Sequence, residues 1–168
     1  MAMQKIKIGI SACLLGENLR YDGGNRLQAE LIRELGPGVE WAPVCPEAGC
    51  GLPVPREEMM LMSSPDGLRL RCKYSFQDHT AMMENWARRK IGELAGADIR
   101  GFVFKSRSPS CGLAVKVFPE GSPRAAGIFA GLFQSAFPDL PVEEETALAG
   151  AGGRARFMRR VSALSRGS

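Results

Sequence analysis

The stretch Phe102–Gly112 reads Phe-Val-Phe-Lys-Ser-Arg-Ser-Pro-Ser-Cys-Gly, an apolar run that passes directly into a polar loop. Three residues with high strand propensity are followed by basic and hydroxyl residues, a Ser-Pro turn, and a cysteine backed by glycine. This pattern is typical of a buried strand that delivers a reactive loop. A single cysteine in such a place can also be no more than a small buried residue. The function of Cys111 therefore depends on what else the chain brings to it.

The same construction occurs twice more in the sequence. Ile6–Ile10 leads into Cys13, and Val39–Val44 leads into Cys45. In a parallel sheet, loops at the carboxyl ends of the strands line the ligand crevice. We therefore expect cysteines that are nearly a hundred positions apart to converge on one point.

Segments with helical spacing alternate with these strands, at Leu27–Leu35, Met83–Leu94 and Ile128–Ala136. The alternation predicts an α/β fold, a single Rossmann-like domain with a mainly parallel sheet and helices on both faces. Two further strands are predicted at 68–72 and 115–118. The pattern over 57–62 is compatible with a helical turn or a short strand.

Length and composition also point to one compact domain, since 45% of the 168 residues are hydrophobic and 24% are charged. The formal net charge of +4 arises in the last fifteen residues, which hold five arginines and no acid. We expect an α/β domain over residues 1–146 and, over 147–168, a flexible Ala/Gly link with an arginine-rich tail. Because the body is nearly neutral, a nucleic-acid partner is not expected.

The five cysteines accompany a single histidine, His79, which excludes a zinc site with several imidazoles. Sulfur ligands without imidazole indicate zinc thiolate or an iron–sulfur cluster. No apolar stretch approaches the roughly 20 residues of a membrane span, and no signal-peptide core is evident. We therefore expect a cytoplasmic protein with reduced cysteines and no membrane partner.

Five motifs together resemble the 2-thiouracil desulfurase family: Ile10–Gly16, Arg20–Gly24, Cys45–Glu47, Gly51–Arg56 and Ser106–Gly112. The resemblance covers roughly residues 5–145. It implies a Rossmann-like fold and a [4Fe-4S] cluster held by three cysteines. It further implies the removal of sulfur from a thiolated pyrimidine, without net redox change, to give the oxo base and sulfide.

Carried over to this chain, the resemblance implies that Cys13, Cys45 and Cys111 are the cluster ligands, with Cys50 as the alternative to Cys45. Three thiolates leave one of the four irons without a protein ligand, a position open to substrate. Glu47 is the implied catalytic acid–base residue, and Ser108 is its polar partner. The expected substrate is a small thiolated base or nucleoside.

Two other hypotheses fit the residues alone. The thiolates could hold zinc or a cluster structurally, in a non-catalytic module that serves a partner protein. Alternatively, the chain could be an α/β nucleotide binder whose cysteines carry no metal.

Overall fold

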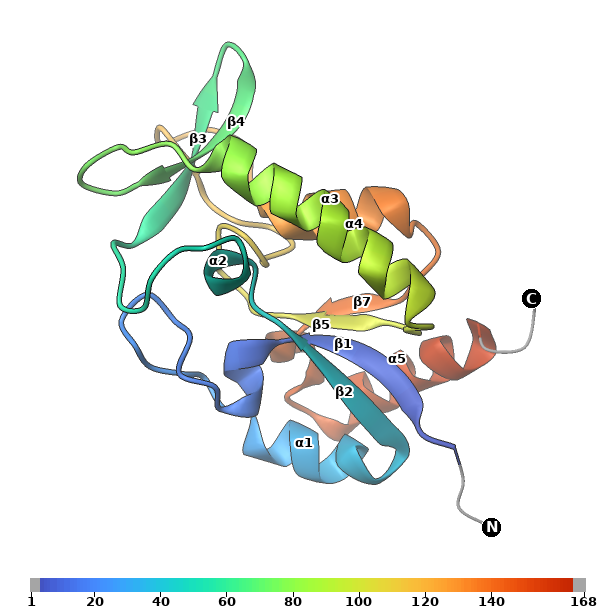
Figure 1. Ribbon diagram of the computed structural model, residues 1–168. Helices are drawn as coiled ribbons and strands as arrows, with labels where there is room; N and C mark the ends of the chain where they lie inside the picture. Colours follow the sequence, from blue (N-terminus) through green and yellow to red (C-terminus); the bar gives the residue numbers. More distant parts are fainter. Residues whose placement is uncertain (1–3, 165–168) are drawn as a thin grey trace.

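The computed structural model describes residues 4–164 and is built around a four-stranded sheet (Figure 1). The strands lie in the order β2-β1-β5-β7, and every neighbouring pair is parallel. Their bounds are Ile6–Ser11 for β1, Val39–Val44 for β2, Phe102–Phe104 for β5 and Val142–Glu144 for β7. The strands predicted before each of the three cysteines are thus confirmed.

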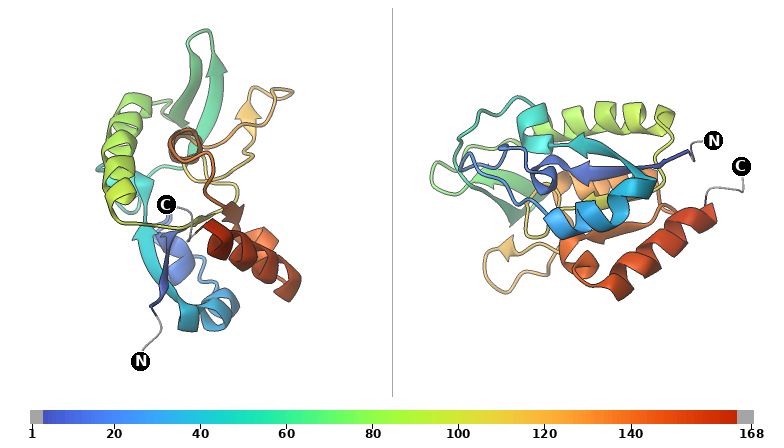
Figure 2. Two further views of the ribbon diagram at one scale, coloured as in Figure 1. Left: turned by 90° about the vertical axis from the view of Figure 1, so that its right-hand side faces the viewer. Right: turned by 90° about the horizontal axis from the view of Figure 1, so that it is seen from below.

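Helices cover both faces of this sheet (Figures 1 and 2). Helices α3 (Thr80–Gly96) and α4 (Ile128–Ala136) lie on one face. Helices α1 (Ala29–Leu35) and α5 (Ala151–Leu164) lie on the other. The predicted α/β class, with a mainly parallel sheet between two helical layers, is confirmed. None of the helices within residues 4–164 is long and apolar enough to cross a membrane.

Strand β5 supplies both layers of the core because successive side chains of a strand point to opposite faces. Phe102 and Phe104 pack against α3 and α4, where Phe129 and Phe133 meet them. Val103 packs on the opposite side with residues of α1 and α5. All five side chains are fully buried, and the Phe102 and Phe104 rings stack with centroids 4.2 Å apart. The predicted core role of the α4 phenylalanines is confirmed.

Gly9 in β1 provides the space that the Phe102 ring occupies. A β-carbon at Gly9 would stand 2.5 Å from Phe102 Cε2, a distance that real β-carbons essentially never show. Gly9 is the pairing partner of Phe102, so its small size lets the ring lie over β1 at the centre of the sheet.

A second, three-stranded sheet lies beyond the carboxyl ends of the first and was not predicted. Strands β3 (Met59–Ser64) and β4 (Gly67–Cys72) form an antiparallel hairpin, and β6 (Val117–Phe118) pairs with β3 in parallel. The segment 57–62 therefore ends in a strand, not in a helical turn. Cys72 is buried in the core of this sheet.

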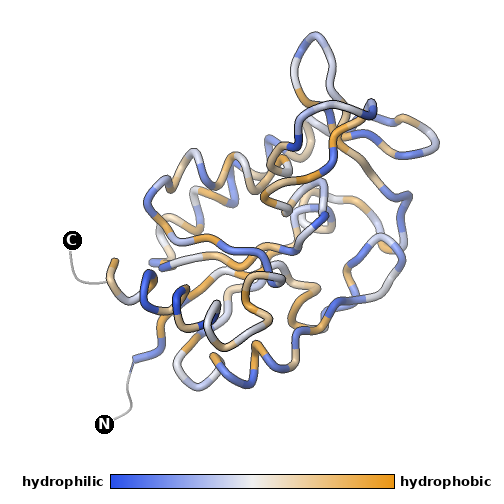
Figure 3. The backbone as a smooth tube through the Cα atoms, turned by 180° about the vertical axis from the view of Figure 1, so that it is seen from behind, coloured by the Kyte–Doolittle hydropathy of each residue, from blue (hydrophilic) through white to orange (hydrophobic). Residues whose placement is uncertain are grey.

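The prediction of a flexible Ala/Gly link in the C-terminal segment is wrong, because residues 151–153 form the first turn of α5. Phe157 and Val161 recur at helical spacing and are buried against the sheet, so the segment has an apolar face that its arginines obscure in the sequence. This alternation along the helix is visible in Figure 3. Arg154 is itself buried and donates to the carbonyl oxygens of Leu148 and Ala149. Arg166 of the predicted tail lies outside the described residues.

A buried ion pair fixes the exit of β5. Lys105 Nζ lies 3.3 Å from Glu145 Oε1, and the two side chains are only 13% and 7% exposed. The same carboxylate accepts hydrogen bonds from the backbone N–H and the hydroxyl of Ser106. The N–H of Lys105 also donates to Ser11 Oγ at the end of β1, at 2.9 Å. The loop that follows β5 is therefore fixed to both neighbouring strands.

The contact between Gly9 and Phe102 gives a first prediction. We expect Gly9→Ala to lower the free energy of unfolding by about 2 kcal/mol or more, because the added methyl group overpacks the sheet. Urea denaturation followed by circular dichroism measures this. Gly92→Ala in α3 is the control, since a β-carbon there meets no atom within 4 Å. This change should stabilise the chain by about 0.5 kcal/mol, and equal effects of the two substitutions would contradict the proposed contact.

The buried ion pair gives a second prediction. Glu145→Ala should cost about 3 kcal/mol, because it leaves the buried Lys105 ammonium without its counter-charge and the Ser106 N–H without its acceptor. The matched control is Glu143→Ala, which removes an exposed ion pair with Arg160. This substitution should cost less than about 1 kcal/mol. Similar unfolding midpoints for the two variants would show that the Glu145 network does not hold the loop.

Candidate active site

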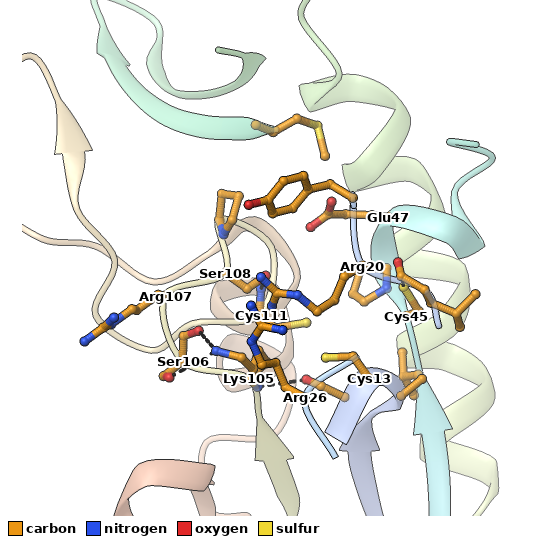
Figure 4. Close-up of a pocket in the computed structure, with 18 of the residues that line it drawn as sticks. Cys13, Arg20, Arg26, Cys45, Glu47, Lys105, Ser106, Arg107, Ser108 and Cys111 are labelled. Carbon is orange, nitrogen blue, oxygen red and sulfur yellow. Dashed lines mark hydrogen bonds between the residues drawn. The ribbon is translucent and has the colours of Figure 1, made fainter. Parts of the chain in front are cut away.

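The three predicted cysteine ligands meet at the carboxyl edge of the parallel sheet. The chain passes from β1 to β2 on one side and later reaches β5 on the other, so β1 and β5 flank the point where the strand order reverses. Ligands of open α/β sheets bind at such a point. Cys13, Cys45 and Cys111 all line one cavity of about 310 Å³, together with Glu47 and Ser108 (Figure 4).

The Cys111 loop rests on the N-terminus of α4. The N–H of Ile128 donates to the carbonyl oxygen of Pro109, and that of Ala130 donates to Ser110, at 3.1 and 3.0 Å. The loop thereby satisfies N–H groups that a helix start leaves without intrahelical partners. Gly127 permits this close approach, since a β-carbon there would stand 2.5 Å from the carbonyl carbon of Ser110.

Cys13 lies in a short 3₁₀ helix, Ala12–Leu15, directly after β1. Gly16 ends this helix with φ of 93°, a left-handed conformation that glycine adopts without strain. The segment that follows returns to the site, because the N–H of Arg26 donates to the carbonyl oxygen of Cys13 at 2.9 Å. Arg20 and Arg26 of this segment both line the cavity.

Cys45 precedes the single helical turn α2, Pro46–Gly49. Proline at the first position and a bond from the Gly49 N–H to the Cys45 carbonyl oxygen, at 2.7 Å, define the turn. Gly49 lies on Trp86 of α3, and a β-carbon there would stand 2.7 Å from Trp86 Cε2. The absence of a side chain at Gly49 thus sets how close the turn lies to the helical layer.

The side chain of Cys50, the alternative ligand to Cys45, lies away from the cavity. Its thiol donates to the carbonyl oxygen of Glu47 at 3.3 Å and packs beside the core of the second sheet. Cys50 is not among the residues that line the cavity. The three thiols that share the cavity are those of Cys13, Cys45 and Cys111.

Glu47 lines the cavity with both carboxylate oxygens engaged. Arg56 Nε lies 2.9 Å from Oε1, in an ion pair whose side chains are 5% and 13% exposed. Arg56 also donates to the carbonyl oxygen of Leu19 and so joins this loop to the one that follows Cys13. The other carboxylate oxygen, Oε2, accepts from Ser110 Oγ at 3.0 Å.

Ser108 also lines the cavity, and its hydroxyl oxygen organises the turn before Cys111. It accepts the N–H of Cys111 at 3.0 Å and the N–H of Ser110 at 3.3 Å. Its third partner is Ser110 Oγ, at 3.0 Å.

The thiols that line the cavity are buried among side chains of positive and of negative charge. Burial is the main cause that raises the pKa of Cys13 to about 11, while the nearby charges of Arg20 and Lys105 act to lower it. Burial likewise raises the pKa of the Cys45 and Cys111 thiols. Metal ligation requires thiolates, so loading this site with metal must release protons.

The residues present fit an anionic iron–sulfur cluster. All five cysteines are free of disulfides, and three of them supply soft donors to one cavity. Within residues 4–164, no His, Cys, Asp and Glu side chains are grouped closely enough to hold a single metal ion. In addition, Arg20 Nε is buried without a hydrogen-bond acceptor in the described part of the chain, and its nearest carboxylate oxygen, Asp22 Oδ1, is 3.9 Å away.

The side chains of two basic residues near the Cys111 loop are directed to different places. Lys105 lines the cavity but is held by Glu145. Arg107 directs its guanidinium away from the thiols (Figure 4).

Sequence reasoning assigned no role to Ser110, Arg56, Arg20 or Arg26. Ser110 and Arg56 are each part of a motif that was singled out, but their link to Glu47 spans loops that are distant in sequence. The Arg20–Gly24 motif was also noticed, although nothing in its spacing indicates that its arginine reaches the cavity.

Comparisons with known proteins indicate one family. The sequence model of the family described as 2-thiouracil desulfurase matches residues 8–145. No curated protein matches the chain. A solved structure described as the [4Fe-4S]-dependent thiouracil desulfidase TudS superposes with a TM-score of 0.73 and is 27% identical. This match covers 95% of the present chain and all of the other.

The family match spans the sheet and every loop that contributes to the cavity. Together with the convergence of three thiols at the switch point of the sheet, it shows that this chain belongs to the 2-thiouracil desulfurase family.

Proposed function

We propose that this chain is an iron–sulfur-dependent desulfurase that converts a small thiolated pyrimidine, such as 2-thiouracil, to the oxo base. The observation that carries the proposal is the meeting of three unpaired thiols and the Glu47 carboxylate around one cavity. The name of the similar solved structure and the family match support the same activity.

In this proposal Cys13, Cys45 and Cys111 hold a [4Fe-4S] cluster and leave one iron without a protein ligand. When bound, such a cluster supplies a Lewis-acidic iron with affinity for a soft sulfur atom. Arg20 and Lys105 lie where their positive charges offset the negative charge of thiolates, because both act on the Cys13 thiol.

The net reaction is a hydrolysis. Water adds its oxygen to the carbon that carries the sulfur, the carbon–sulfur bond breaks, and the oxo base and sulfide are formed. Glu47 is the proposed general base, since its carboxylate lines the cavity and can accept the proton that the attacking water loses. Arg56 holds one carboxylate oxygen, which limits the directions in which the base can point.

Other lining residues suit the apolar faces of a flat ring. Leu19, Tyr21 and Met59 border the cavity beside the thiols, and apolar walls exclude competing water. Ser108 is the proposed polar partner of Glu47, which it reaches through Ser110. The two hydroxyls form a hydrogen-bonded chain between Ser108 and the carboxylate.

The activity itself is the third prediction. The chain, reconstituted with iron and sulfide without air, should release sulfide from 2-thiouracil. Glu47→Gln should lower kcat by about 10²- to 10⁴-fold, the usual contribution of a general base, while iron content and visible absorption stay unchanged. Glu34→Gln, in the exposed part of α1, is the control. No sulfide from the wild-type chain, or full activity after Glu47→Gln, would contradict the proposal.

The choice of ligand is the fourth prediction. Cys45→Ala should prevent assembly of a stable cluster, because it removes one of the three thiols that share the cavity. Cys50→Ala should keep the cluster, because that thiol faces the second sheet. Iron and acid-labile sulfide per chain measure both effects, and the reverse result would assign the third ligand to Cys50. A wild-type chain that takes up no iron would instead favour the nucleotide-binder hypothesis.

A further inference from the structure

Ser110 contacts the proposed base although it does not line the cavity. Its side chain is buried, with 1% of the residue exposed, and its hydroxyl oxygen lies 3.0 Å from Glu47 Oε2. The two residues are 63 positions apart in the sequence, so the contact joins two loops. Neither the family match nor the similar structure's description assigns Ser110 a role.

The hydrogen bonds around Ser110 have a defined direction. The Ser110 hydroxyl lies 3.0 Å from Glu47 Oε2 and 4.0 Å from Cys111 Sγ, and because a carboxylate only accepts, Ser110 donates its proton to Glu47. The Ser110 oxygen can then accept from the Ser108 hydroxyl, 3.0 Å away. Ser108 Oγ accepts in turn the N–H groups of Ser110 and Cys111. The direction therefore runs from the backbone of the Cys111 loop to the carboxylate.

The two donors that hold Glu47 come from different parts of the structure. Arg56 follows α2 in the chain and binds Oε1, and it also donates to the carbonyl oxygen of Leu19, so it ties Glu47 to the loop that follows Cys13. Ser110 directly precedes Cys111 and rests on α4 through its carbonyl oxygen. The Ser110 hydroxyl therefore fixes Oε2 of Glu47 relative to the loop that carries a proposed cluster ligand.

We propose that Ser110 is a positioning residue for the desulfuration reaction, which holds the Glu47 carboxylate at the angle needed to accept a proton beside the cluster. The proposal rests on the function proposed above. It assigns Ser110 no contact with substrate, so its loss should reduce turnover and leave substrate binding nearly unchanged.

The test is a double-mutant cycle on the iron-loaded chain. Ser110→Ala should lower kcat by about 10- to 100-fold, the rate equivalent of one hydrogen bond to a charged group, with KM within about threefold and iron content unchanged. In a Glu47→Ala background the same substitution should have almost no further effect, because the residue it acts through is gone.

Two conservative variants separate positioning from packing. Ser110→Thr keeps the hydroxyl and should retain most of kcat, whereas Ser110→Cys nearly keeps the volume, is a weak donor, and should resemble Ser110→Ala. Thr80→Val is the matched control, because it removes a buried hydroxyl that accepts the Leu70 N–H at 2.8 Å, outside the cavity. Its kcat should equal that of the wild-type chain.

The proposal is overturned if Ser110→Ala turns over as fast as Thr80→Val, or if the losses from Ser110→Ala and Glu47→Ala multiply. Failure of the proposed function is a separate result, namely no sulfide release from the wild-type chain. In that case the unfolding midpoints of the four proteins of the cycle still test the contact. Non-additive midpoints support the link between Ser110 and Glu47, and additive midpoints refute it.

Discussion

The parallel pairing of β1 with β2 and β5 is the constraint on which the site depends. Parallel strands end at the same edge of a sheet, so residues that follow them meet without being close in the sequence. Gly9 and Phe102 bring the two central strands together, and the Lys105–Glu145 pair fixes the loop after β5. The positions of Cys13, Cys45 and Cys111 follow from these contacts.

The charges and hydrogen bonds around the three thiols also shape the site. Burial disfavours bare thiolates, and the cations that line the cavity are placed to offset thiolate charge. Glu47 is held by one donor from its own loop and one from the loop of Cys111. The proposed base and the proposed cluster ligands thus share one hydrogen-bonded framework, as expected of a site in which geometry is set before substrate arrives.

Much of the fold could be predicted because its signals are local. Apolar runs such as Phe102–Phe104 and helical spacing such as that of α4 record burial directly. Strands at 68–72 and 115–118 were predicted and are confirmed by β4 and β6, but their assembly with β3 into a second sheet could not be predicted, since β6 pairs with a strand far away in the sequence. Helix α5 was misread because its glycines and arginines conceal the buried face of Phe157 and Val161. The cysteines and Glu47 were found through strand ends and motifs, whereas the contact between Ser110 and Glu47 exists only in three dimensions.

The proposed function requires three thiols of this chain to hold a four-iron cluster and to leave one iron open to the substrate. The most direct measurement is the Mössbauer spectrum of the chain reconstituted with isotopically enriched iron, recorded with and without 2-thiouracil. We expect one iron to be distinct from the other three, and its signal alone to change when 2-thiouracil is added. Four irons whose signals all stay unchanged when the thiolated base is added would contradict the proposed open iron.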